Sequence, residues 1–185
     1  DLIGLSAFFS EILPEAAFVS PNAPFPCDMA PMGYQWFSLQ NRDESSMLKG
    51  VQTAAPILNQ FIDQQLEKFN LTEDKTFLVG FSQGTMMSLY VAPRRQKPLA
   101  GIIGYSGRLI GGNDLKNNIR SYPPALLVNG DMDDLVPSEL QREAVDCLNS
   151  LGVSVQGYVC SGLGHSIDQR GLNFSRDFIR SIIDL

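Results

Sequence analysis

Apolar residues follow two alternating patterns along this chain. Short compact apolar runs, typical of buried strands, alternate with longer segments in which apolar residues recur at the spacing of one helix face. The expected strands cover residues 16–20, 76–81, 100–105, 125–129 and 153–159. The expected helices cover residues 46–69, 83–93, 137–151 and 167–185.

Individual residues refine these helices. Ser138 stands where it could cap the helix of residues 137–151, and Pro93 should end the helix that begins at Gln83. Pro56 falls inside the long helix and is the expected site of a kink. Helical segments separate most of the strands, which favours parallel connections. The sequence therefore predicts an α/β fold, with a mainly parallel central sheet and helices on both faces.

Composition adds limits to this picture. The chain has 185 residues, 44% of them hydrophobic and 18% charged, which is enough apolar material for one packed domain spanning 1–185. The net charge is -6 and the basic residues are scattered, so we expect no nucleic acid or anionic membrane partner. No apolar stretch approaches the length of a transmembrane helix, and the apolar run 2–13 lacks the basic segment of a signal peptide.

The cysteines indicate a compartment. Cys27, Cys147 and Cys160 form neither a CxxC pair nor the dense pattern of a disulfide scaffold. A reducing, cytoplasmic location is therefore expected.

Gly80-Phe81-Ser82-Gln83-Gly84 matches the G-x-S-x-G pattern of a nucleophile elbow. Both glycines are expected there, because side chains two residues on either side of the serine would collide with the backbone of so tight a turn. A predicted strand precedes the motif and a predicted helix follows it, as the elbow requires. For the pentapeptide alone, a glycine-rich turn with an incidental serine is the alternative interpretation.

A serine hydroxyl needs a base to become a good nucleophile, and His165 is the single histidine of the chain. It lies in a glycine-containing loop between the last predicted strand and the last predicted helix. A surface or helix-capping histidine is the alternative. Its position after the last strand favours a base that serves Ser82.

The third member of a catalytic triad is a carboxylate that orients the histidine. Three acids follow a predicted buried strand, and a calcium loop of the EF-hand type is excluded because position 135 is Leu, 136 is Val and 142 is Arg. The order serine, acid, histidine is that of the α/β-hydrolases. The acids are Asp131, Asp133 and Asp134.

On these motifs the chain resembles the phospholipase/carboxylesterase branch of the α/β-hydrolases, which includes acyl-protein thioesterases. The resemblance covers nearly the whole chain and rests on the elbow, on residues 130–137, which are similar to the family's G-D-x-D-x-x-V-P, on Gly164-His165 and on Trp36-Phe37. It implies a fold without a large cap domain and without a cofactor or metal.

The resemblance also assigns roles to residues. It implies that Asp133 is the catalytic acid beside Ser82 and His165, with Asp131 in support. It implies that the backbone N–H of Gln83 is one donor of the oxyanion hole.

Apolar residues near these motifs are candidates for the wall of an acyl groove, although ordinary packing is an equal alternative for each of them. They are Trp36, Leu135 and Val136, with Phe25, Met29 and Met32 beside them.

One departure from the family concerns the second oxyanion donor. Family members usually carry it on a strand and His-Gly-x-Gly type loop near their start, and residues 1–5 look like what directly follows that loop. We therefore expect this chain to lack the N-terminal strand and the oxyanion loop.

The sequence predicts a serine hydrolase that cleaves carboxylic esters or thioesters through an acyl-enzyme, with a small molecule or an acylated protein as its substrate. The absent loop motivates an alternative, a non-catalytic relative that binds acylated ligands or partners. A peptidase or dienelactone-type hydrolase on the same fold is a third hypothesis. Relatives of this size often form homodimers, and the sequence leaves both a monomer and a homodimer open for this chain.

Overall fold

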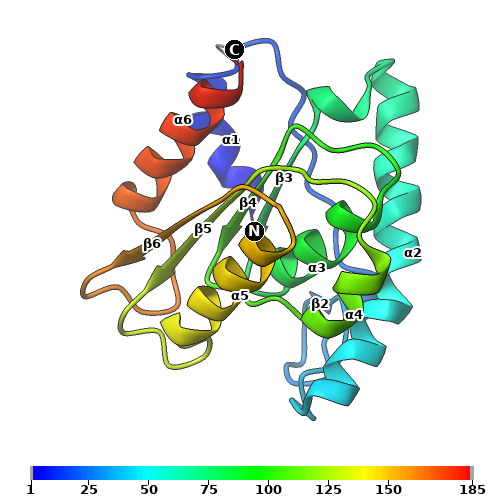
Figure 1. Cartoon of the computed structure of the whole chain (residues 1–185), viewed down its shortest axis with the longest axis vertical. Coiled ribbons are helices and arrows are strands. Elements are labelled where there is room, and N and C mark those ends of the chain that lie inside the picture. Colours follow the sequence, from blue (N-terminus) through cyan, green and yellow to red (C-terminus); the bar gives the residue numbers. More distant parts are fainter. Residues whose placement is uncertain (1, 184–185) are drawn as a thin grey trace.

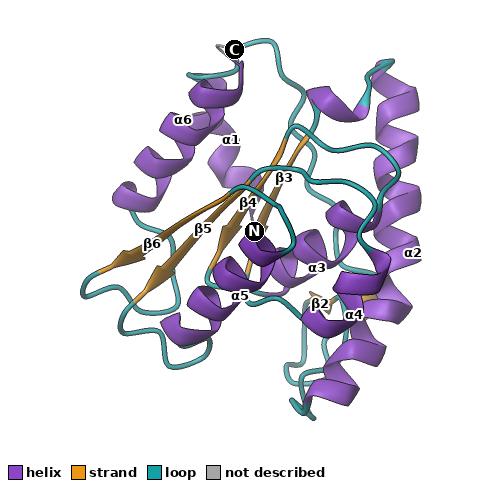
Figure 2. Cartoon of the chain, viewed as in Figure 1, coloured by secondary structure: helices purple, strands orange, loops and turns teal. Residues whose placement is uncertain are grey.

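The centre of the protein is a four-stranded parallel sheet, seen in a computed structural model that describes residues 2–183. The strands lie side by side in the order β3-β4-β5-β6, which is also their order in the sequence (Figure 1). Their carboxyl ends, the arrowheads of Figure 2, lie at one edge of the sheet. The predicted α/β class and parallel sheet are confirmed. The strands are β3 (Phe77–Phe81), β4 (Gly101–Tyr105), β5 (Ala125–Gly130) and β6 (Val155–Cys160).

Helices lie between and around these strands, and the structure adds short elements that the apolar pattern did not predict. A two-stranded antiparallel hairpin pairs β1 (Phe25–Pro26) with β2 (Tyr34–Gln35). Short 3-10 helices cover Leu2–Leu5, Glu73–Lys75 and Ala92–Arg94. The α-helices are α1 (Ser6–Ser10), α2 (Glu44–Phe69), α3 (Gln83–Val91), α4 (Gly112–Asn118), α5 (Ser138–Ser150) and α6 (Gln169–Ile183).

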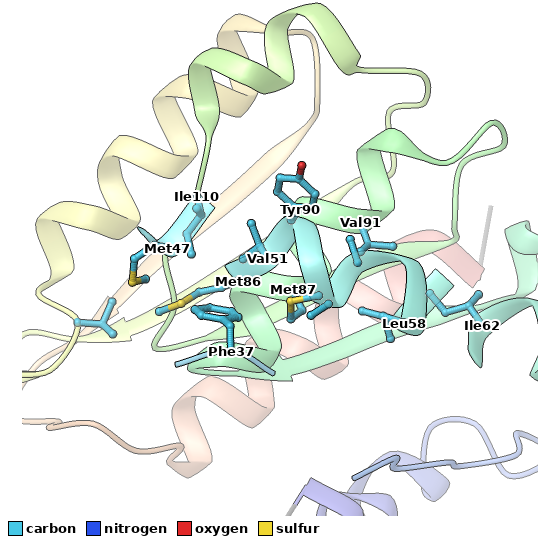
Figure 3. Packing of buried hydrophobic residues seen from close by; sticks show 13 residues of the cluster. Phe37, Met47, Val51, Leu58, Ile62, Met86, Met87, Tyr90, Val91 and Ile110 are labelled. Atoms are coloured by element: carbon cyan, nitrogen blue, oxygen red, sulfur yellow. The ribbon is translucent and has the colours of Figure 1, made fainter. Parts of the chain in front are cut away.

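The helices form layers on both faces of the sheet. Helices α3 and α5 cover one face, and α2 packs on the outer side of α3 (Figure 1). Helices α1 and α6 cover the opposite face, where Phe9 and Phe178 are buried against Ile103. Figure 3 shows the core between α2 and α3, in which Val51 and Met87 are fully buried. No large cap domain interrupts the described chain.

Local signals explain the bounds of α2, which is the longest helix. Asp43 caps its start, because the Asp43 carboxylate accepts a hydrogen bond from the Ser46 backbone N–H at 2.9 Å. Asn70 ends it in the left-handed conformation, with φ 51°. The helix is continuous through Pro56, the expected kink site. Within residues 2–183, no helix combines the length and the apolar character that crossing a bilayer requires.

Two sequence predictions are wrong in this part of the structure. Residues 16–20 form no strand: they pair with no strand of the described chain and line the larger cavity beside the unpaired edge of β3. Ser138 does not cap α5 but is its first residue, and the cap position is taken by Pro137, whose carbonyl accepts the Leu140 N–H at 3.0 Å. The last two residues of the predicted helix 167–185 lie outside the described residues.

Candidate active site

Ser82 lies at the junction between β3 and α3 in a strained backbone conformation. Its φ of 53° and ψ of -114° are unusual for a residue with a side chain. The Ser82 N–H donates to the Tyr105 carbonyl at 2.9 Å, which fixes the turn to the neighbouring strand. A Cβ at Gly80 would lie 2.4 Å from the backbone of Gly84 and Thr85, so only glycine fits there. This is the strand-turn-helix geometry of a nucleophile elbow.

The second glycine of the motif is different. A Cβ at Gly84 would meet no atom within 4 Å, so the expected collision at this position is wrong. Gly84 lines a larger cavity on the far side of the elbow, and its missing side chain would point into open space.

His165 and Asp133 form a direct pair. The His165 Nδ1 lies 2.8 Å from one Asp133 carboxylate oxygen and 3.0 Å from the other. The Asp133 side chain is fully buried, and the Phe81 ring packs against the imidazole with ring centroids 4.8 Å apart. The imidazole ring is therefore held on one side by a carboxylate and on another by an aromatic ring.

The backbone around Asp133 favours its charged form. Its Oδ1 accepts the Val136 N–H at 2.9 Å and the Leu135 N–H at 3.0 Å. Burial by itself would raise the pKa of the Asp133 carboxyl, but the hydrogen bonds from Val136, His165 and Leu135 outweigh burial and lower the pKa below its usual value. A carboxylate that stays charged can hold the imidazole in the tautomer with its proton on Nδ1.

Hydrogen bonds join the loop that carries Asp133 to the loop that carries His165. The Gly162 N–H donates to the Asp131 carboxylate at 2.6 Å, and the Met132 N–H donates to the Leu163 carbonyl at 2.9 Å. A Cβ at Gly130 would lie 1.9 Å from the Leu163 carbonyl oxygen, which shows how closely the loops pack. Asp131 thus holds the histidine loop in place.

Asn129, near the end of β5, stabilises the loop that carries Asp133. It is buried, and its Nδ2 donates to the Val136 carbonyl at 2.8 Å. This bond closes the turn that presents the two backbone N–H groups to Asp133.

Ser82 and His165 line the same small pocket, which has a volume of about 90 Å³. Two of the predicted groove residues, Leu135 and Val136, are in its wall. The apolar part of the wall is formed by Leu39, Met47, Met86, Leu135, Val136 and Leu140. The remaining members are the two arginines Arg42 and Arg108.

The other predicted groove residues lie elsewhere. Trp36 lines the larger cavity, which has a volume of about 560 Å³. Met29 and Met32 are 58% and 84% exposed, and with Phe25 they line neither of these two cavities.

Gln83 connects the elbow to the segment that carries Trp36. The Gln83 side chain accepts the Trp36 N–H at 3.0 Å and donates to the Phe37 carbonyl at 2.8 Å. Its backbone N–H belongs to the first turn of α3, where an α-helix leaves its amides without intrahelical acceptors. That amide is therefore in a suitable place to bind a negative oxygen beside Ser82.

Sequence reasoning did not identify Arg42 and Arg108 as part of the pocket. A signal for Arg108 was present, because Ser106-Gly107-Arg108 directly follows the predicted strand of residues 100–105 and so lies at the same edge of the sheet as Ser82. In the part of the chain that the structure describes, no group of three or more His, Cys, Asp or Glu side chains could hold a metal ion.

Comparisons with known proteins identify the family of this chain. A family profile described as phospholipase/carboxylesterase matches residues 3–183. Esterase YpfH from Escherichia coli is 27% identical, over 95% of this chain and 74% of its own length. Acyl-protein thioesterase 1 homolog 1 from Dictyostelium discoideum is 26% identical, over 88% of this chain and 75% of its own length. The crystal structure of esterase PE8 superposes with a TM-score of 0.95 at 39% identity, over 99% of this chain and 86% of that one. The chain therefore has the α/β-hydrolase fold and belongs to the phospholipase/carboxylesterase family of ester hydrolases.

Proposed function

We propose that Ser82, His165 and Asp133 form a catalytic triad that hydrolyses carboxylic esters or thioesters through an acyl-enzyme. The observation that carries this proposal is the Asp133–His165 pair, at 2.8 Å, in the loops beside a pocket that also contains the strained Ser82. The Asp133 carboxylate keeps the imidazole proton on Nδ1, so Nε2 is free to act as a base.

In the first half of the reaction, the Ser82 Oγ forms a bond to the acyl carbon while His165 takes the hydroxyl proton. The negative oxygen that develops accepts a hydrogen bond from the Gln83 backbone N–H at the start of α3. His165 then gives its proton to the leaving alcohol or thiol as the bond to the acyl carbon breaks.

In the second half, His165 removes a proton from water, which attacks the acyl-enzyme. The carboxylic acid leaves and Ser82 regains its proton. The six apolar side chains of the pocket wall are suited to the carbon chain of a short acyl group, because the cavity volume is only about 90 Å³. The names of the relatives, an esterase and an acyl-protein thioesterase homolog, support both ester and thioester substrates.

A fluorophosphonate probe and p-nitrophenyl butyrate test this proposal together. The wild-type protein should be labelled on one serine and should hydrolyse the ester, and Ser82→Ala should abolish the labelling and reduce kcat by about 10⁴-fold or more. Ser88→Ala is the matched control. Ser88 is a second serine of α3 that does not line the small pocket, and its hydroxyl donates to the Gly84 carbonyl. Labelling and turnover that survive in Ser82→Ala would rule the triad out.

The same assay separates this proposal from the alternative of a non-catalytic relative, which would bind acylated ligands and show neither labelling nor turnover in the wild type. A comparison of ester with amide substrates separates it from a peptidase. We further propose a cytoplasmic location, which the three unpaired cysteine thiols of the described chain support. Sedimentation equilibrium would distinguish a monomer from a homodimer.

A further inference from the structure

The small pocket beside Ser82 is cationic, although the chain as a whole has a net charge of -6. Its ionisable wall residues are Arg42, Arg108 and His165, and no acidic side chain of the described chain lines it. The Asp133 carboxylate is buried behind the imidazole and is occupied by His165 and two backbone N–H groups. The wall of this pocket therefore contains two arginines and, among the described residues, no carboxylate that would compete with a ligand for them.

Arg108 differs from Arg94 and Arg95, two other partly buried arginines, because no acid of the described chain neutralises it. Arg94 pairs with Asp114 at 2.7 Å and Arg95 pairs with Asp63 at 2.7 Å. Among residues 2–183, Arg108 takes part in no ion pair, although its Nε is buried without a hydrogen-bond partner just as those of Arg94 and Arg95 are. An arginine without an acid partner can pair with a carboxylate that a ligand supplies.

The backbone that carries Arg108 is fixed at the reactive edge of the sheet. It follows β4 through Ser106, which has φ 46° and donates its N–H to the Val128 carbonyl at 2.9 Å. A Cβ at Gly107 would lie 2.3 Å from Thr85 in α3, so the turn packs directly against the elbow helix. Arg108 is thus held near Ser82 by two neighbouring elements.

Arg42 reaches the same pocket from another part of the chain. It directly precedes Asp43, the residue that caps α2, so its backbone is anchored to the start of that helix. Arg42 is exposed, whereas Arg108 is partly buried. We therefore expect Arg108 to contribute more to binding than Arg42, because solvent and salt weaken an exposed charge more strongly.

From these observations we infer that the pocket selects esters whose acyl chain ends in a carboxylate. The inference rests on the proposed function, in which Ser82 attacks the acyl carbon. The methylene groups of such a chain contact the apolar wall, and the terminal carboxylate binds Arg108, whose planar guanidinium can donate two parallel hydrogen bonds to it. Arg42 adds a second positive charge at the mouth. The small volume of about 90 Å³ favours a short dicarboxylic monoester over a long fatty acyl chain.

Monoethyl glutarate and ethyl pentanoate make a matched pair of substrates for the test. Both release ethanol and carry acyl chains of the same length, and they differ in the terminal carboxylate. We expect the wild-type ratio of kcat/KM, glutarate over pentanoate, to exceed about ten, and Arg108→Met to lower that ratio by about 10- to 100-fold. Arg42→Met should lower it by a few fold, and Arg108→Glu should bring it below one.

Arg120→Met is the control variant, because Arg120 is exposed and lines neither cavity. It should leave the ratio unchanged. If an Arg108 variant does not fold, the salt dependence of the wild-type enzyme replaces it: raising NaCl from about 10 mM to about 500 mM should reduce the ratio through screening.

A wild-type ratio of one or less would overturn the inference, and so would a ratio that neither Arg108→Met nor added salt changes. The proposed function is tested separately by ethyl pentanoate. If Ser82→Ala hydrolyses that neutral ester as well as the wild type does, the triad is wrong. If only the ratio fails, the triad stands and the anionic selectivity is wrong.

Discussion

Two cavities lie on either side of the elbow, and they differ in both size and chemistry. The larger one, of about 560 Å³, is lined mostly by apolar side chains of the N-terminal segment, of α2 and of β3, such as Phe9, Phe61 and Val79. The smaller one, of about 90 Å³, contains Ser82 and His165. The larger cavity would be the default choice for a binding site by size alone. The polar groups that can react are nevertheless gathered around the smaller one.

The difference follows from where each cavity lies in the sheet. The larger cavity borders β3, which pairs with β4 on one side only and is mostly half-buried, whereas every residue of β4 and β5 is buried. The smaller cavity lies at the carboxyl ends of the strands, where loops after β3, β4, β5 and β6 meet. The volume of the larger cavity therefore indicates incomplete packing beside β3. The polar side chains that converge on the smaller cavity from fixed loops indicate a reactive site.

The comparison of the two cavities predicts its largest effect, a loss of kcat, for Asp133→Asn beside the smaller cavity. The amide would no longer hold the imidazole in the tautomer with its proton on Nδ1, so kcat for p-nitrophenyl butyrate should fall by about 10⁴-fold. Asp134→Asn is the matched control, because Asp134 is an exposed neighbour in the same loop. It should change kcat by less than about twofold. Equal losses in the two variants would contradict the assigned roles.

A second comparison uses the two glycines of the elbow. Gly80→Ala should lower the free energy of unfolding by about 3 kcal/mol and abolish activity, because its Cβ would lie 2.4 Å from backbone atoms and displace Ser82. Gly84→Ala should be neutral or stabilising by up to about 1 kcal/mol, because alanine favours the helix and its Cβ would enter the larger cavity.

Urea unfolding and ester hydrolysis measured on both glycine variants check this pair. A Gly84→Ala variant that loses as much stability as Gly80→Ala would show that the open space beside Gly84 is not present in solution.

The sequence predicted the parts of the fold that local signals dictate. β3, β4, β5 and the helices α3 and α5 follow from compact apolar runs, from helical spacing and from the glycines near Ser82, whereas α4 after β4 was not predicted. The pairing of Asp133 with His165 was anticipated by family resemblance and not by the residues alone, because three acids in one loop were equivalent by composition. The structure distinguishes them through burial and through the N–H groups of Leu135 and Val136.

The sequence predictions that failed depend on contacts in three dimensions, which the order of residues along the chain does not reveal. Residues 16–20 are apolar enough for a strand, yet a strand forms only where the backbone comes within hydrogen-bonding distance of a neighbouring strand, which is a tertiary property. Arg108 carries no motif, and its role depends on the absence of an acid partner in three dimensions. Trp36 was expected beside Leu135 and Val136, but the Gln83 side chain holds its backbone on the other side of the elbow, in the wall of the larger cavity.

The Gln83 side chain joins the elbow to the segment of Trp36, in the wall of the larger cavity, and Gln83→Ala should have an intermediate effect. Removing the amide leaves the Trp36 N–H and the Phe37 carbonyl without partners, which should cost about 1–3 kcal/mol of unfolding free energy. The backbone N–H remains, so we expect kcat/KM to fall by less than about tenfold. Gln83→Glu keeps the acceptor for Trp36 and loses the donor to Phe37, and should lie between the wild type and Gln83→Ala. A loss of activity as large as that of Asp133→Asn would mean that the side chain itself takes part in the reaction.

The smallest effect concerns the start of α2, the helix that borders both cavities. Hydrogen bonds from the Ser46 N–H and from the hydroxyls of Ser45 and Ser46 lower the pKa of the Asp43 carboxyl to about 2. Since the pKa is about 3.9 in an unfolded chain, the folded protein binds fewer protons between these values, and this stabilisation is lost as the pH falls through that window. The free energies of unfolding of the wild type and of Asp43→Asn, measured in urea, should therefore differ most at pH 5 to 7 and converge toward pH 2.

Hydrogen exchange should place the change in the first turn of α2, near Met47 of the smaller cavity, and leave the amides around Ile62 of the larger cavity unaffected. A difference in stability that is constant with pH, or one that spreads to Ile62, would show that the charge of Asp43 does not act locally on this end of the helix.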